Sequence, residues 1–162
     1  MVNQLIEKMI GYFGTDVRRI NHALKVYTFA SCIAHRENLS ETEMLIIEMT
    51  SVLHDIGIKQ AELKYNSSAA RYQETEGPPI AKLLLADMEL DSEIIDRICF
   101  IIGNHHHYQK IDKVDFQILV EADFLVNIYE DKISKDAIES VLNTYFKTKT
   151  GISFLKNMYL AK

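Results

Sequence analysis

His54 and Asp55 are adjacent polar side chains inside an otherwise apolar stretch, residues 52–58. Burying an imidazole beside a carboxylate costs free energy unless each group finds a partner. A divalent cation satisfies both groups at once, and the alternative is an ion pair at the end of a helix. We therefore expect a metal site here, provided that other segments supply further ligands.

His22 is a second candidate ligand. It shares a helical face with Val26, Phe29 and Ile33, which predicts that its imidazole points inward. The alternative is a core histidine that hydrogen-bonds to a backbone carbonyl.

Asp123 lies in the middle of the apolar helical segment 118–126, where a carboxylate needs a partner. The alternative to a metal is a buried salt bridge to an arginine; the candidates are Arg18, Arg19 and Arg97. Glu121 lies about 200° away around the same helix, and we expect it to be solvated.

Three consecutive histidines, residues 105–107, follow another apolar segment near a helix end. They indicate either a metal or phosphate site or a solvated loop. A ligand set of imidazoles and carboxylates suits Fe, Mn, Co, Ni or Zn better than Ca.

Helices must position these residues, because apolar side chains recur at helical spacing through almost the whole chain. His54 and Asp55 reach one ion only if their helix ends there, and Gly57 favours a left-handed turn at that point. Residues 57–76 are polar and aperiodic, which predicts a long loop with helical turns near 60–63 and 68–72. We expect helices at 2–13, 16–37, 41–55, 77–88, 92–103, 114–129, 134–147 and 152–160.

The overall composition is that of an ordinary globular protein. The chain has 162 residues, of which 48% are hydrophobic and 25% charged, with a net charge of −5. An acidic chain does not offer a general nucleic-acid or anionic-membrane surface. The absence of a signal sequence and of a long apolar run predicts a cytoplasmic protein, with Cys32 and Cys99 as buried reduced thiols.

The order His22, His54-Asp55, Asp123 resembles the HD-domain superfamily of metal-dependent phosphohydrolases. Residues 21–26 resemble the helix of the family's first histidine, and residues 52–57 resemble its central motif. Residues 102–106 resemble the Ile-x-x-His-His element, and residues 121–125 the final Ala-Asp element. The resemblance implies one all-α domain, a bundle of about six to eight helices with a central metal site. Its core would span residues 16–130, with a helical extension at 131–162.

The resemblance also implies a ligand set. His22, His54, Asp55 and Asp123 would bind one metal. Two-metal members use a further histidine in the segment before the helix expected at Gly77, and this chain has none there. Glu74 or Glu76 would have to replace it, with His105 and His106 completing a second site and Asp55 bridging the two. The number of ions, one or two, remains open.

The implied chemistry is attack of a metal-activated water on phosphorus, with Asp55 holding the metal and accepting the proton of the water. Lys59, Arg18 and Arg19 are candidates for binding the phosphate. Four residues of the 60–76 loop would cover the pocket and stack on a base: Lys64, Tyr65, Arg71 and Tyr72.

Two functions are compatible with these residues. The first is a metal-dependent phosphohydrolase, a phosphomonoesterase or phosphodiesterase, acting on a nucleotide or related small phosphate ester. The second is a non-catalytic HD module that keeps the metal and binds a nucleotide or protein partner. The intact ligand set favours the enzyme. The helices after residue 130 either pack on the core or form a homodimer.

Overall fold

The computed structural model describes residues 1–161. This part of the chain contains nine α-helices and no strand. They are α1 (Val2–Phe13), α2 (Val17–Arg36), α3 (Glu41–Leu53), α4 (Ile58–Tyr65), α5 (Ala70–Leu85), α6 (Ser92–Ile102), α7 (Val114–Glu130), α8 (Lys135–Tyr145) and α9 (Lys149–Leu155), with a 3₁₀ turn η1 (Tyr108–Lys110) and a π-helical turn η2 (Lys156–Leu160). The all-α prediction is confirmed. One more helix is present than expected, because residues 58–65 are helical.

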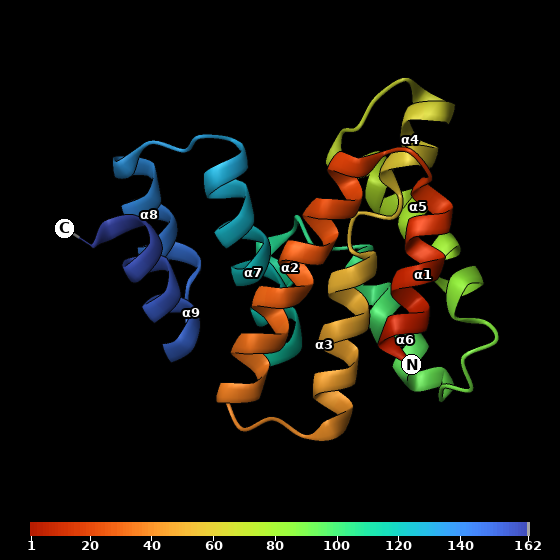
Figure 1. Cartoon of the computed structure of the whole chain (residues 1–162), viewed down its shortest axis with the longest axis horizontal. Helices are drawn as coiled ribbons and strands as arrows, with labels where there is room; N and C mark the ends of the chain where they lie inside the picture. The colour runs from red at the N-terminus through yellow and green to blue at the C-terminus, as the bar shows by residue number, and fades with distance from the viewer. Residues whose placement is uncertain (162) are drawn as a thin grey trace.

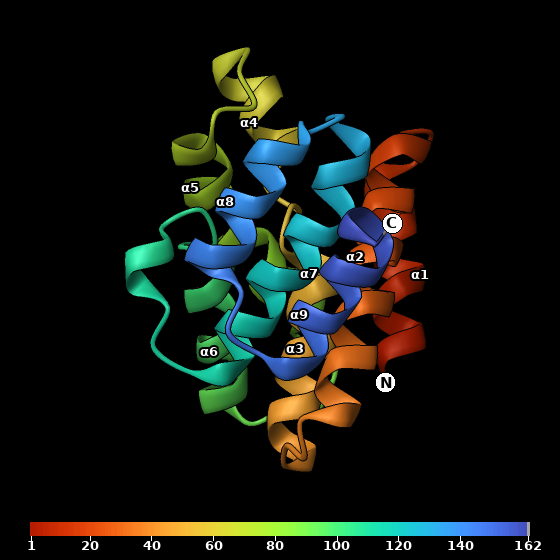
Figure 2. The ribbon, with the colours of Figure 1, turned by 90° about the vertical axis from the view of Figure 1, so that its left-hand side faces the viewer.

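The helices α2, α3 and α7 form the centre of the bundle and pack on one another (Figure 1). Helices α1, α5 and α6 cover one side of this centre, and α8 and α9 lie on the other side, next to α7 (Figures 1 and 2). The core between them contains fully buried side chains from each central helix, such as Ile33, Leu53 and Leu125. The candidate metal ligands come from the central helices and the turns that follow α3 and α6.

Side-chain hydrogen bonds fix the starts of α2 and α3. The Asp16 carboxylate accepts a hydrogen bond from the Arg19 backbone N–H at the start of α2. At α3, the Ser40 hydroxyl accepts from the Glu43 N–H while the Glu43 carboxylate accepts from the Ser40 N–H. This reciprocal capping box fixes where α3 begins.

The prediction of a long loop over residues 57–76 was wrong. Residues 58–65 form α4, which buries Ile58 and Ala61 and ends where Asn66 adopts a left-handed conformation with φ 50°. Good helix formers and these two buried contacts outweigh the polar composition. Helix α5 then begins at Ala70, seven residues earlier than expected, and carries Pro78 and Pro79 in its interior.

The segment after residue 130 packs on the core through a buried carboxylate. Glu121 is fully buried and accepts hydrogen bonds from the backbone N–H groups of Lys147 and Thr148, at 2.6 and 2.9 Å. It also accepts from the Thr148 hydroxyl and from the Gln117 amide. The expectation that Glu121 is solvated was therefore wrong: it anchors the segment before α9 to α7, and burial raises its pKa.

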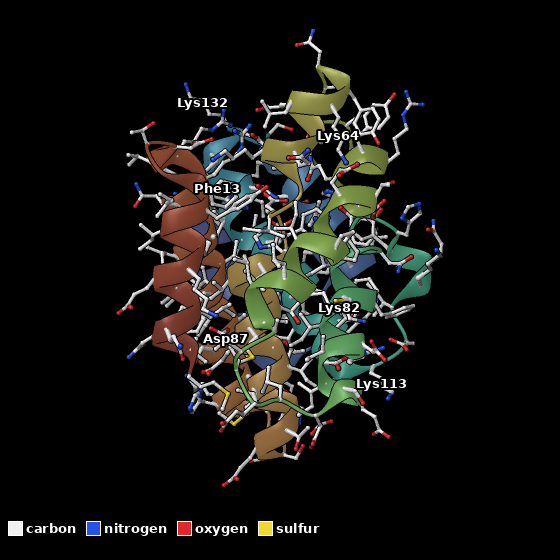
Figure 3. All side chains as sticks on the ribbon, turned by 90° about the vertical axis from the view of Figure 1, so that its right-hand side faces the viewer. Phe13, Lys64, Lys82, Asp87, Lys113 and Lys132 are labelled. Atoms are coloured by element: carbon white, nitrogen blue, oxygen red, sulfur yellow. The ribbon has the colours of Figure 1, made fainter. Side chains whose placement is uncertain are left out.

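Cys32 and Cys99 are free thiols, but the prediction that both are buried was wrong. Cys32 is exposed on α2 and Cys99 is partly buried on α6. Within residues 1–161, no helix is both long and apolar enough to cross a membrane. Figure 3 shows Lys64 on α4, Lys82 on α5 and Lys113 just before α7 at separate points of one face.

Candidate metal centre

Three candidate ligands from different parts of the bundle meet at one point. Nε2 of His22 on α2 lies 3.2 Å from Nε2 of His54 and 3.2 Å from Oδ1 of Asp123 on α7. Nε2 of His54 lies 3.7 Å from the same carboxylate oxygen. We call His22, His54 and Asp123 the first group; their ligand atoms all lie close enough to share one ion.

The end of α3 places His54 and Asp55 on the same side of the chain, as the sequence required. Hydrogen bonds from Ile56 N to Leu53 O (2.9 Å) and from Ile58 N to Asp55 O (3.0 Å) form tight turns between α3 and α4. Asp55 Oδ2 therefore lies 3.6 Å from Nε2 of both His22 and His54.

Gly57 serves a different purpose from the one predicted. Its φ is −72°, so the turn is not left-handed. A Cβ at this position would instead overlap the carbonyl oxygen of Gln73 and lie 2.7 Å from the Gly77 nitrogen. The glycine lets α5 approach the turn of His54 and Asp55 at backbone contact.

A second set of ligand atoms faces the other oxygen of Asp55. His105 Nε2 lies 3.5 Å from Asp55 Oδ1, and the rings of His105 and His106 lie 3.9 Å apart, centroid to centroid. We call Asp55, His105 and His106 the second group. Asp55 thus offers one oxygen to each group.

Hydrogen bonds at Nδ1 fix the orientation of three imidazoles. Nδ1 of His54 faces the Ser51 carbonyl at 2.9 Å, and Nδ1 of His105 faces the Ile102 carbonyl at 2.8 Å. Nδ1 of His22 faces Glu130 Oε2 at 3.0 Å. Each of these oxygens accepts, so each Nδ1 carries a proton and each Nε2 faces the centre.

The two carboxylates expected to replace the missing histidine join neither group. Glu74 accepts hydrogen bonds from the His106 backbone N–H (3.1 Å) and from Nδ1 of His107 (3.0 Å), so it holds the histidine segment in place. Glu76 pairs with Lys64 at 2.7 Å and accepts from the Tyr65 hydroxyl at 3.0 Å.

The predicted phosphate-binding residues differ in their surroundings. Lys59 Nζ donates to the Tyr12 carbonyl at 2.6 Å, on α1. Arg19 pairs with Asp16 and Glu62. Arg18 is exposed, forms no ion pair within residues 1–161, and lines a cavity of about 230 Å³ that His22 and Asp55 also line. Arg18 is therefore the predicted phosphate ligand whose charge is available beside the metal centre.

The aromatic residues expected to cover the pocket stack on each other. The rings of Tyr65 and Tyr72 are nearly parallel, with centroids 4.2 Å apart, and the Arg71 guanidinium lies 4.5 Å from the Tyr72 ring centroid. This stack ties α4 to α5.

Several residues of the site were missed at the sequence level. Glu130 orients His22 and also pairs with Lys25, while the Asn127 amide donates to Asp123 Oδ1 at 2.9 Å. Residues 123, 127 and 130 share one face of α7 at helical spacing, and that signal could have found them. Gln73, which lines the cavity, carries no comparable signal.

The surrounding charges and burial give the histidines of the centre different pKa values. Burial opposes a proton on His22, but Asp123, Asp55 and Glu130 outweigh that effect and raise its pKa to about 9. Burial and the neighbouring His105 lower the pKa of His106 to about 4. Burial also opposes ionisation of Asp55, yet the surrounding imidazoles hold its pKa well below the usual range.

The residues fit a divalent transition metal. Nε2 of His105 and Nε2 of His106 are buried and have no hydrogen-bond partner within residues 1–161, which is costly in a purely structural site. Mixed imidazole and carboxylate ligands with hydrogen-bonded Nδ1 atoms are the arrangement by which proteins hold Fe, Mn, Co, Ni or Zn.

Comparison with known proteins supports the fold. No family model and no curated protein matches the chain. The structure is similar to a crystal structure described as a predicted HD superfamily hydrolase from an uncultured Thermotogales bacterium, with a TM-score of 0.72 and 23% sequence identity. The match covers 98% of this chain and 84% of that chain. The chain therefore has the fold of the HD superfamily, as its His-Asp motifs predicted.

Proposed function

We propose that this protein is a metal-dependent phosphohydrolase that acts on a nucleotide or related small phosphate ester. The observation that carries the proposal is the convergence of Nε2 atoms from His22, His54 and His105 around the two oxygens of Asp55. The comparison structure, described as a hydrolase of the same fold, supports it.

Two ions fit the arrangement better than one. When Asp55 is shared, the first group offers four ligands and the second group offers three, and a different oxygen of Asp55 faces each group. When bound, divalent ions supply positive charge to phosphate oxygens and lower the pKa of a water molecule toward neutrality. His22, His54 and Asp123 would hold the first ion, and His105 and His106 the second.

The protein's own groups orient the reactants. The Asp55 carboxylate stays ionised because its pKa is low, so its oxygens accept a proton of the attacking water in a hydrogen bond and aim that water. Arg18, one helical turn before His22, is placed to bind the phosphate oxygens. Lys59 donates to the Tyr12 carbonyl, and Arg19, which also lines the cavity, pairs with Asp16 and Glu62, so their charges are less available to phosphate than that of Arg18.

Metal analysis and phosphate release test this function together. Protein purified without chelator should contain about two transition-metal ions per chain and should release phosphate from a nucleotide panel or a generic phosphodiester with Mn, Co or Ni. Asp55→Ala should lose both ions and reduce the rate by about 10³-fold, several kcal/mol of transition-state stabilisation.

The outcomes separate the two functional classes. Metal binding without phosphate release from any compound would favour the non-catalytic module that binds a nucleotide or a protein partner. Unchanged metal content in Asp55→Ala would contradict the site itself. His35→Ala, an exposed histidine on α2 outside both groups, is the matched control and should behave as wild type.

A further inference from the structure

The cavity beside the metal centre has polar walls. Among the residues that line it, Ile58 is the one apolar side chain and no phenylalanine, tyrosine or tryptophan occurs. Nucleobases are usually held by stacking on aromatic rings, and the one ring in the lining, the His22 imidazole, is engaged with His54 and Asp123. The part of a ligand that lies here must instead form hydrogen bonds.

Gln73 presents an acceptor that no protein group satisfies. Its Nε2 donates to the Ser68 carbonyl at 2.5 Å, which fixes the orientation of the amide. Its Oε1 is buried and has no partner within residues 1–161, and the residue as a whole is only 9% exposed. A buried carbonyl oxygen without a donor is unfavourable, so a ligand O–H that reaches this point is favourable.

Two carboxylates add further acceptors to the lining. Each oxygen of Glu130 accepts one bond, from Lys25 or from His22, and retains a second lone pair. Asp131 is exposed and forms no ion pair within the described residues. Together with Gln73, these groups match a ligand that carries several hydroxyl donors.

Arg18 supplies the complementary charge. It lines the same cavity one helical turn before His22, and its guanidinium has no acidic partner within residues 1–161. A guanidinium in this position binds phosphate oxygens in a bidentate manner. Arg19 also lines the cavity but pairs with Asp16 and Glu62, so Arg18 is the guanidinium available for phosphate beside several acceptors for hydroxyls.

We infer that this cavity recognises the sugar of a sugar phosphate, and that sugar hydroxyls rather than a base determine which esters are accepted. Gln73, Glu130 and Asp131 accept from the hydroxyls while Arg18 binds the phosphate. In a nucleotide substrate the pentose occupies the cavity and the base remains outside it. This inference rests on the proposed function, because it assigns the substrate class of the same site.

Ribose 5-phosphate and phenyl phosphate are the decisive probes, because both carry the phosphate and only the first carries sugar hydroxyls. Michaelis constants are measured where phosphate is released, and dissociation constants by calorimetry where it is not. Wild type should bind ribose 5-phosphate at least 10-fold more tightly. Gln73→Met should weaken ribose 5-phosphate about 3- to 10-fold and leave phenyl phosphate unchanged.

Arginine variants separate the phosphate contact from the sugar contacts. Arg18→Gln should weaken both probes equally, whereas Arg36→Gln, an exposed arginine at the other end of α2, should weaken neither. AMP, GMP, CMP and UMP should differ from one another by less than about 3-fold, and each hydroxyl removed from the ribose should cost about 3- to 10-fold.

Three results would overturn the inference: equal binding of the two probes, equal weakening of both by Gln73→Met, or discrimination among the four bases beyond 30-fold. A failure of the proposed function gives a different pattern, since no compound would then release phosphate. The calorimetric comparison of the probes would still decide whether the cavity binds the sugar.

Discussion

His22 of the first ligand group and His106 of the second differ in how they are prepared for metal. In the first group, an oxygen accepts from Nδ1 of both His22 and His54. His22 has a pKa near 9, so its imidazole is protonated on both nitrogens in the metal-free protein. In the second group, Nε2 of His106 is unpartnered and its pKa is near 4. His22 thus stores a proton where an ion would bind, and His106 offers a neutral, unsatisfied nitrogen.

This difference has a physical origin in the surrounding carboxylates. Three of them, Asp55, Asp123 and Glu130, surround His22, so charge attraction outweighs burial. At His106, burial and the adjacent His105 dominate over more distant carboxylates. We therefore expect the first group to exchange a proton for metal at neutral pH, and His106 to bind without deprotonation.

The largest expected effect comes from removing one ligand of each group. His22→Ala should abolish binding of the first ion, and His106→Ala should remove the second ion while the first remains. Elemental analysis of the purified variants should give about one ion per chain in each case, against two in wild type. Loss of both ions in His106→Ala would mean that the two groups are one site.

The pH dependence of stability should distinguish the two histidines in metal-stripped protein. Because the folded pKa of His22 is raised above its ordinary value, His22 stabilises the fold below pH 6.5, and that stability is lost as the pH rises through 9. Because the folded pKa of His106 is lowered, His106 destabilises the fold as the pH falls from 6.5 toward 4. Each effect amounts to about 3 kcal/mol at most.

Urea unfolding at pH 5, 6.5 and 9 in the presence of chelator measures both effects. Stability should be greatest near pH 6.5. His22→Asn should remove the decline toward pH 9, and His106→Asn should remove the decline toward pH 5. A profile that is flat in wild type, or unchanged in both variants, would contradict the assigned charge states.

A smaller effect is expected from the carboxylate that orients His22. Glu130→Gln keeps the shape of the side chain but removes its charge, so affinity for the first ion should fall by about 10- to 100-fold. Affinity for the second ion should not change, because Glu130 contacts neither His105 nor His106. Calorimetric titration with Mn²⁺ measures both, and Glu139→Gln, an exposed glutamate on α8, is the matched control.

The first group was predictable from the sequence because each of its residues interrupts an apolar helical face. His22, His54 and Asp123 lie close enough together to share one ion, and Asp55 lies 3.6 Å from both histidines. The surroundings of the second group were not predictable, because Pro78 and Pro79 suggested a helix start at Gly77. With α5 beginning at Ala70, Glu74 holds the histidine segment, and Gln73, an ordinary polar residue in the sequence, reaches the cavity.

The smallest effect tests whether α5 maintains the second group. Gly57→Ala places a methyl group against the Gln73 carbonyl and the Gly77 nitrogen, both backbone atoms that cannot rotate away. We expect a loss of about 1–3 kcal/mol in the free energy of unfolding. Gly11→Ala on α1 is the control; nothing lies within 4 Å of its added methyl, so it should stabilise by about 0.5–1 kcal/mol.

The metal content of Gly57→Ala shows whether a displaced α5 weakens one ligand group or both. A displaced α5 moves Glu74, and with it the backbone of His106, so the second ion should bind more weakly than in wild type. The first ion depends on α2, α7 and the end of α3, and it should be retained. Equal weakening of both ions would show that the turn carrying His54 and Asp55 moves as well, because Asp55 is the ligand that both groups share.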